Sequence, residues 1–169
     1  MNARMLGKLL GFAGAAMWFG TIPVLADGNC RQVGGGVLTN FLDPSQCMPT
    51  SGSSVPLCTD GTATGDLRGA VGVQVLGISG NVYHVHHHWV TESGDTISLN
   101  DAYLTIYPTS DPNNRVLADY LNGVEIIGGT GAFAGAKGLA YAWGAGDLTL
   151  GEITLRYAGT VCFKPVPPS

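Results

Sequence analysis

Apolar and polar residues alternate with a period of two along several stretches of the chain. The clearest stretch covers residues 83–91, where Tyr83, Val85, His87 and Trp89 alternate with more polar neighbours. Successive side chains of a β-strand point to opposite faces, so this alternation predicts a strand with one apolar face. Outside the first 26 residues no stretch has the periodicity of an amphipathic helix. The pattern therefore predicts an all-β domain.

Turn-forming residues separate the expected strands from one another. Glu92-Ser-Gly-Asp95 lies between residues 83–91 and 96–107, which makes these two runs the clearest hairpin. Short strands at this spacing, without helices to cover a parallel sheet, predict an antiparallel barrel or sandwich, and a barrel leaves no sheet edge open. The full set of expected strands is 37–42, 67–75, 83–91, 96–107, 116–120, 124–127, 138–143 and 152–162.

A glycine-rich segment spans residues 123–144 and permits two interpretations. Its sequence Gly129-x-Gly131-x-x-x-Gly135 resembles a dinucleotide-binding loop, which requires a helix that begins at the glycines. The residues that follow instead alternate large side chains with Gly or Ala, as a strand does. We therefore expect a tight turn between two strands. The large side chains expected on one face of the second strand are Leu139, Tyr141 and Trp143.

The first 26 residues have the features of an export signal. Arg4 and Lys8 precede the apolar run 9–24, and Val24-Leu-Ala26 places small residues at the cleavage positions. A retained membrane anchor is the alternative, but the run is short for a full span and is interrupted by Gly and Pro. We expect an exported protein, periplasmic or secreted. The expected segments are a signal peptide (1–26), an N-terminal strand with a disulfide-tied loop (27–65) and a barrel core (66–169).

The composition argues against several classes of partner. The formal net charge is −4, and it becomes more negative once the two basic residues of the signal are removed. Such an acidic domain has no basic surface for nucleic acid or for an anionic membrane, so we expect neither partner for the mature protein. With 45% hydrophobic residues, 12% charged residues and 26 glycines, the chain suits a compact β-rich domain better than a disordered one.

All four cysteines follow the predicted signal: Cys30, Cys47, Cys58 and Cys162. An exported protein meets an oxidising compartment, which favours two disulfides. Three pairings are open. The Pro- and Ser-rich loop between Cys47 and Cys58 favours closure of that loop, with Cys30 paired to Cys162. A metal-thiolate cluster is the alternative, but the chain has no C-x-x-C pair.

Residues 83–89, Tyr-His-Val-His-His-His-Trp, contain every histidine of the chain. On a strand His84, His86 and His88 face one way, and two imidazoles at this spacing can bind zinc or copper. Three such positions extend over about 13 Å, so one ion needs a ligand from another strand, such as the carboxylate of Asp101. We expect a polar outer face or an oligomer contact here and no metal, with a metal site at His84 and His86 as the alternative.

The opposite face of the same strand is mainly aromatic and carries His87. If that face lines the interior of a barrel, burial favours the neutral imidazole, which accepts or relays a proton. We expect a core histidine with satisfied hydrogen bonds here, and His87 as a catalytic residue is the alternative. The side chains expected around the cavity are Tyr83, His87, Trp89, Tyr103, Tyr141 and Trp143.

The order of these motifs resembles the allene oxide cyclase barrel family, whose barrel is shared by dirigent proteins. The resemblance covers residues 66–162 and rests on Ala102-Tyr-Leu-Thr105 followed by Gly128-Gly-Thr-Gly-x-Phe-x-Gly-x-x-Gly138. It implies an eight-stranded antiparallel β-barrel, commonly oligomeric, with an apolar cavity. Plant members of the family cyclise an unsaturated fatty-acid epoxide, and dirigent members steer the coupling of phenolic radicals.

The chain also departs from this family. Its N-terminal strand, residues 33–40, has no carboxylate, so no catalytic residue can be carried over. The export signal and the cysteines indicate an extracytoplasmic member and are compatible with a bacterial one. We expect a barrel that binds an apolar or aromatic small molecule without a cofactor. It acts either as a cyclase or isomerase that folds a flexible substrate, or as a non-catalytic carrier or structural protein that can form homo-oligomers.

Overall fold

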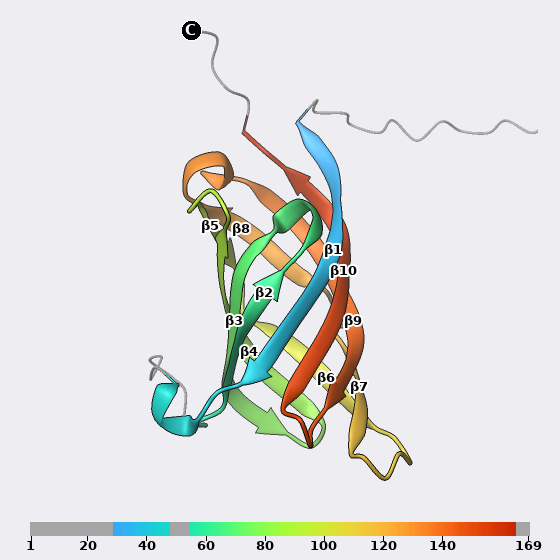
Figure 1. Cartoon of the computed structure of the whole chain (residues 1–169). Coiled ribbons are helices and arrows are strands. Elements are labelled where there is room, and N and C mark those ends of the chain that lie inside the picture. The colour runs from blue at the N-terminus through green and yellow to red at the C-terminus, as the bar shows by residue number, and fades with distance from the viewer. Residues whose placement is uncertain (1–28, 48–54, 165–169) are drawn as a thin grey trace, which may run out of the picture.

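The computed structural model describes residues 29–47 and 55–164. The predicted signal segment, residues 1–26, lies outside these ranges. The described chain consists mainly of β-strands, which are joined by turns and by single turns of 3-10 helix (Figure 1). None of the helical turns in the described ranges is long and apolar enough to cross a membrane.

Ten strands of the described chain form one antiparallel sheet. They are β1 (Cys30–Phe41), β2 (Cys58–Ala63), β3 (Gly69–Ser79), β4 (Val82–Thr91), β5 (Thr96–Leu99), β6 (Ala102–Pro108), β7 (Arg115–Asp119), β8 (Val124–Gly129), β9 (Lys137–Asp147) and β10 (Glu152–Cys162). The 3-10 turns are η1 (Pro44–Gln46), η2 (Gly65–Leu67) and η3 (Gly131–Phe133).

The sheet closes on itself as a barrel (Figure 1). Strands β1 to β4 pair in chain order, and β4 then pairs with both β5 and β6, which continue one another. Strands β8 and β7 likewise continue one another, because both pair with β9. Strand β10 pairs with β9 on one side and with β1 on the other, which completes the ring. The expected eight-stranded antiparallel barrel is thus confirmed.

The main differences between the strands and the sequence-based expectation concern β2, the run 96–107 and the start of β1. Strand β2 is not revealed by alternation, because Cys-Thr-Asp-Gly-Thr-Ala has no large apolar side chain. The expected run 96–107 is divided into β5 and β6 at Asn100, whose side-chain amide donates a hydrogen bond to Glu125. Strand β1 begins at Cys30, earlier than expected, because Gly34–Gly36 continue its pairing with β10.

The glycine-rich segment forms the turn between β8 and β9, as expected. Gly129 has a φ of 153°, and a Cβ at this position would collide with the carbonyl oxygen of Thr96. Glycine is therefore required where the turn approaches the start of β5. The chain continues through η3 into strand β9, and no α-helix begins at the glycines. The segment consequently lacks the helix N-terminus on which a dinucleotide loop depends.

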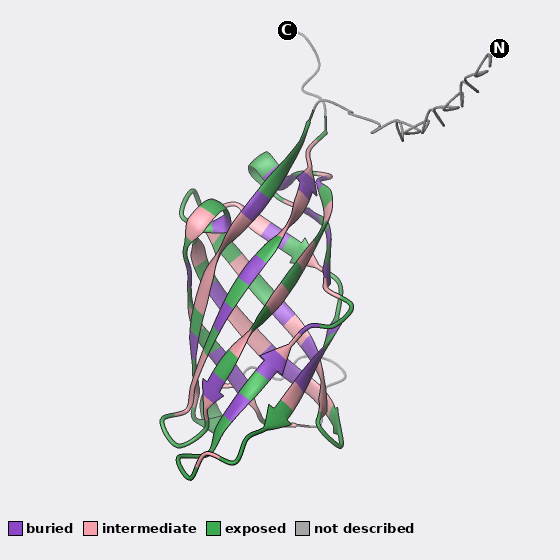
Figure 2. Ribbon diagram, turned by 90° about the vertical axis from the view of Figure 1, so that its right-hand side faces the viewer, coloured by how far each residue is buried: buried purple, intermediate pink, exposed green. Residues whose placement is uncertain are grey.

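Buried and exposed residues alternate along the strands (Figure 2). Apolar side chains fill the interior in two clusters, one around Ile126 and Val161 and the other around Val85 and Ala118. The start of β1 and the end of β10 lie together at one end of the barrel (Figure 1). The opposite end carries the β6–β7 and β9–β10 turns.

Both expected disulfides are present. Cys30–Cys162 joins the first residue of β1 to the last residue of β10, and the two cysteines are direct cross-strand partners. Cys47–Cys58 joins the chain after η1 to the first residue of β2. All four cysteines are paired, so none supplies a thiolate for the metal cluster considered as an alternative.

Candidate binding site in the barrel interior

Strand β4 directs its two faces to different environments. Val85 and His87 are buried, with exposed fractions of 1% and 8%, whereas His88 is exposed. Tyr83 and Trp89 have the same parity as His87 and line hollows in the interior. The face of this strand that was expected to line the interior does so in the structure.

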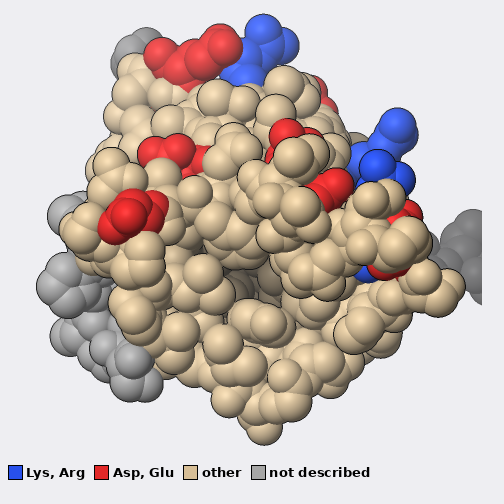
Figure 3. All heavy atoms as spheres, turned by 60° about the horizontal axis from the view of Figure 1, so that its bottom comes forward, with Lys and Arg blue, Asp and Glu red and all other residues tan. Residues whose placement is uncertain are grey.

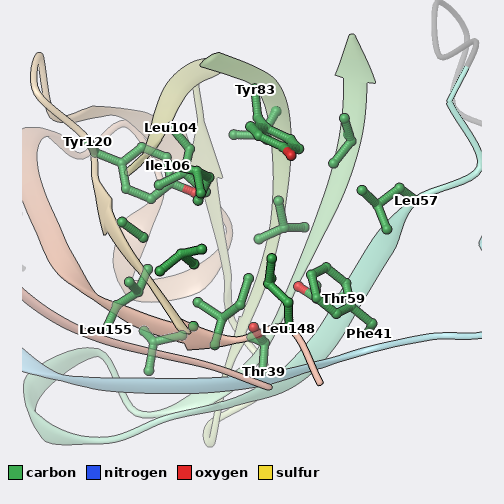
Figure 4. A pocket seen from close by; sticks show the side chains of 18 residues that line it. Thr39, Phe41, Leu57, Thr59, Tyr83, Leu104, Ile106, Tyr120, Leu148 and Leu155 are labelled. Atoms are coloured by element: carbon green, nitrogen blue, oxygen red, sulfur yellow. The ribbon is translucent and has the colours of Figure 1, made fainter. Parts of the chain in front are cut away.

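Inward side chains of the described residues line two neighbouring hollows. The first, here called the outer hollow, has a volume of about 100 Å³, and Phe41, Leu57 and Leu148 belong to its wall (Figure 4). These residues lie toward the end of the barrel opposite the Cys30–Cys162 disulfide, and a space-filling view of that end shows a central depression surrounded by uncharged residues (Figure 3).

The second hollow, here called the inner hollow, has a volume of about 60 Å³. Its wall includes Leu67, His87 and Trp89. The two hollows are adjacent, because four residues belong to both walls: Val37, Val73, Tyr120 and Leu155. Among the described residues, neither wall contains an Asp, Glu, Lys or Arg.

Small inward residues on β9 make room for these hollows. Ala140 and Ala142 line the inner hollow, and Gly146 lines the outer one. Larger side chains at these three positions would occupy the space between the barrel walls. The alternation on β9 thus places its small residues inside.

A histidine and a tyrosine form a polar pair within the apolar interior. Nε2 of His87 and the hydroxyl oxygen of Tyr120 are hydrogen-bonded at 2.8 Å. Burial, with a smaller contribution from the charge of neighbouring His86, lowers the pKa of His87 from 6.5 to about 4, so the imidazole is neutral at neutral pH. Burial also raises the pKa of Tyr120 well above its ordinary value, which keeps the phenol protonated.

One nitrogen of His87 remains unpaired. Nδ1 is fully buried and has no hydrogen-bond partner among the described residues. In one neutral tautomer Nε2 donates to Tyr120 and Nδ1 is a free acceptor. In the other tautomer Tyr120 donates to Nε2 and Nδ1 carries a free N–H. Either way the pair retains a hydrogen-bonding atom without a partner among the described residues, so His87 lacks the fully satisfied hydrogen bonds that we expected of a core histidine.

Trp89 and Tyr157 have a different role at the inner hollow. The indole Nε1 of Trp89 donates to the carbonyl oxygen of Leu67 at 2.8 Å. The hydroxyl of Tyr157 donates to the carbonyl oxygen of Thr64 and accepts from the backbone N–H of Leu67, both at 2.9 Å. Their rings pack edge to face with centroids 5.7 Å apart. Because their polar atoms are occupied, these side chains contribute an apolar wall and anchor η2.

The wall of the outer hollow contains a buried hydroxyl group from strand β2. Thr59 is 7% exposed, and its Oγ1 is fully buried without a hydrogen-bond partner among the described residues. Figure 4 shows its hydroxyl oxygen directed toward the lined space. Thr39, on the neighbouring strand β1, is buried in the same wall.

Three of the aromatic residues expected around the cavity lie outside the barrel. Tyr103, Tyr141 and Trp143 have exposed fractions of 57%, 47% and 46%, and none belongs to the wall of either hollow. Tyr103 stacks on His84 on the outer surface, with ring centroids 4.9 Å apart. The expectation was wrong for these residues because alternation defines two faces of a strand without saying which face is inside.

The outward histidines of β4 meet a carboxylate from the break between β5 and β6. Asp101 lies 2.7 Å from Nδ1 of His86 and 3.8 Å from Nε2 of His84. Burial and the charge of His86 lower the pKa of His88. In the described ranges no group of three or more His, Cys, Asp or Glu side chains is arranged to hold a metal ion. The contacts fit the polar outer face that the alternation predicts.

Tyr120 and Thr59 are among the interior residues that the sequence patterns did not identify. Tyr120 follows β7 with the inward parity of Val116 and Ala118, and this spacing was the signal that could have identified it. Thr59 lies on a strand without a recognisable apolar alternation, so its position inside the barrel had no sequence signal. Tyr83, His87 and Trp89 do lie where the sequence placed them, on the interior face of β4.

Comparisons with known proteins do not assign the chain to a family. No family model matches it, and no curated protein sequence matches it. One solved structure that resembles it is that of the pterocarpan synthase dirigent protein GePTS1, with 11% sequence identity and a TM-score of 0.36. The alignment covers 83% of this chain and 88% of that protein.

Proposed function

We propose that this protein binds a slim apolar or aromatic small molecule inside its barrel. The observation that carries the proposal is the His87–Tyr120 pair, in which Tyr120 lines both apolar hollows and His87 keeps a nitrogen without a partner among the described residues. Binding sites for small molecules combine apolar walls with a few placed polar groups, as this interior does. The two disulfides support an exported protein, since such bonds persist in oxidising compartments.

The size of the hollows limits what they accept. Their volumes are about 100 and 60 Å³. A dry apolar cavity of about 150 Å³ is known to accept benzene, so a single ring or a short chain suits this interior better than a bulky polycyclic molecule.

The proposal is tested by binding of para-cresol to tag-free protein with intact disulfides, measured by calorimetry. Ala142→Leu, which fills the inner hollow, should weaken binding at least tenfold. Ala145→Leu is the matched control, because Ala145 is exposed on the outer face of the same strand. No binding to the wild type, or equal binding to both variants, would contradict the proposal. Mass spectrometry of the natively purified protein then identifies the chemical class of any bound molecule.

A cofactor-free isomerase or cyclase is the second candidate function. The observation that favours it is the neutral imidazole of His87, which can take a proton from one position of a bound molecule and return it to another. The barrel would hold the reactant in a reactive conformation. The test is incubation of the molecule identified in the barrel with the wild type and with His87→Gln. Isomer conversion by the wild type alone supports catalysis, and absence of conversion by both leaves a carrier.

A further inference from the structure

Two polar atoms of the described side chains are fully buried without a partner, and both belong to walls of the hollows. They are Oγ1 of Thr59, a residue in the wall of the outer hollow, and Nδ1 of His87, a residue in the wall of the inner hollow. Both residues are more than nine-tenths buried. Folded proteins rarely leave such atoms unpaired, because each loses its hydrogen bonds to water without replacement. Their shared location points to a ligand that pairs with both.

The two residues lie in one row across the barrel wall. Thr59 on β2 is the cross-strand partner of Val73 on β3, and Val73 is the partner of His87 on β4. Neighbouring strands are about 4.8 Å apart, so the backbones of Thr59 and His87 are separated by about 10 Å. Val73 lies between them and belongs to the walls of both hollows. The row therefore places a polar side chain at each end, Thr59 and His87, with the apolar side chain of Val73 between them.

We propose that the ligand is a neutral molecule with a hydrogen-bonding group at each end of a slim apolar body. One end pairs with Oγ1 of Thr59 and the other with Nδ1 of His87, while the body packs against Val73. A charged end is disfavoured, because no described wall residue is an acid or a base that could neutralise it. This inference rests on the proposed binding function and specifies the substrate class.

Three probes of similar size test it: para-hydroxybenzyl alcohol, which is neutral with two polar ends, para-cresol with one, and para-hydroxybenzoate with a charged end. Calorimetry on the tag-free, disulfide-intact protein at neutral pH should show the alcohol binding about tenfold tighter than para-cresol, since each tenfold corresponds to one well-formed hydrogen bond. Para-hydroxybenzoate should bind at least tenfold more weakly than para-cresol.

Substitutions assign the two ends. Thr59→Val keeps the side-chain shape and should abolish the tenfold advantage of the alcohol while leaving para-cresol affinity within about twofold. His87→Leu should abolish the same advantage, because it removes the partner of the other polar end of the ligand. The melting temperature of this variant checks that the barrel is folded. Thr62→Val is the matched control, because Thr62 is exposed on the outer face of β2 and should keep the full advantage.

The outcomes separate this inference from the proposed function. If para-cresol binds but the alcohol has no advantage, or keeps its advantage in Thr59→Val, the two-ended ligand is wrong and the apolar binding site remains. Tighter binding of para-hydroxybenzoate than of para-cresol also contradicts the inference. If none of the three probes binds, the proposed function fails as well.

Discussion

Nε2 of His87 lies 2.8 Å from the hydroxyl oxygen of Tyr120, and this hydrogen bond connects strand β4 to the end of β7 across a mainly apolar interior. Both side chains are buried, with exposed fractions of 8% and 3%. Burial keeps both groups neutral, so the pair is a dipolar contact and not an ion pair. It places a polar group beside both hollows without introducing a charge.

Removing the phenol hydroxyl should destabilise the protein. Tyr120→Phe leaves Nε2 of His87 buried without a partner, and we expect the free energy of unfolding to fall by about 1–3 kcal/mol. Urea denaturation measures this change. Tyr141→Phe is the control on the outer face, where loss of an exposed hydroxyl should change stability by less than about 0.5 kcal/mol. Equal effects of the two substitutions would contradict the assigned role of Tyr120.

Acid should destabilise the barrel through His87. The unfolded chain binds a proton below pH 6.5, whereas the folded chain does not bind it at His87 until about pH 4. The free energy of unfolding should therefore fall as the pH falls from 6.5 to 4, by up to about 3 kcal/mol in total. Denaturation of the wild type and of His87→Leu across this pH range isolates the contribution of His87.

The control for this pH dependence is His84→Gln, which changes an imidazole on the outer face. The part of the acid destabilisation that belongs to His87 should persist in this variant. If His87→Leu and the wild type have parallel pH profiles, His87 is not held neutral by burial.

Thr59→Val should stabilise the ligand-free protein. The substitution replaces a buried, unpaired hydroxyl with a methyl group of similar size, and the expected gain in unfolding free energy is about 1 kcal/mol. Residues that serve binding often reduce the stability of the ligand-free protein, so that their replacement increases it. Differential scanning calorimetry measures the gain. Thr62→Val, on the exposed face of the same strand, should change stability by less than about 0.5 kcal/mol, and a loss of stability in Thr59→Val would show that its hydroxyl has a partner.

How far the sequence predicts the interior depends on the contrast between the two faces of each strand. On β4 one face carries His84, His86 and His88 and the other is mainly aromatic, so the polar face was correctly placed outside. On β9 the two faces are both apolar, and one is formed by Gly and Ala. Alternation did not show which face is inside, and the aromatic Tyr141 and Trp143 were expected there, whereas the hollows are lined by the small residues of β9.

The connection of distant strands was beyond the reach of local patterns. The row Thr59–Val73–His87 depends on the register of three strands, and β2 has no alternation that would reveal it. The cysteines, in contrast, were paired correctly, because the short loop between Cys47 and Cys58 favoured its own closure. The barrel class followed from many short strands without helices.

The two disulfides should differ in their contribution to stability. Cys30–Cys162 closes a loop with a sequence separation of 132, and Cys47–Cys58 one with a separation of 11. Loop-closure entropy in the unfolded chain gives about 5 kcal/mol for the first and about 3 kcal/mol for the second. The double variant Cys30→Ser/Cys162→Ser should therefore lose more unfolding free energy than Cys47→Ser/Cys58→Ser, as measured by urea denaturation. A smaller loss for the first pair would contradict the expectation.

The most direct measurement of occupancy inside the barrel is methyl NMR of the valines during titration with para-cresol. Val73, Val75 and Val85 line the hollows, whereas Val90 is 41% exposed on the outer surface. The proposed function predicts saturable shifts of the three interior methyl signals, lost in Ala142→Leu and kept in Ala145→Leu, with little change at Val90. Shifts confined to Val90, or unperturbed interior valines at saturating para-cresol, would contradict a ligand-binding barrel.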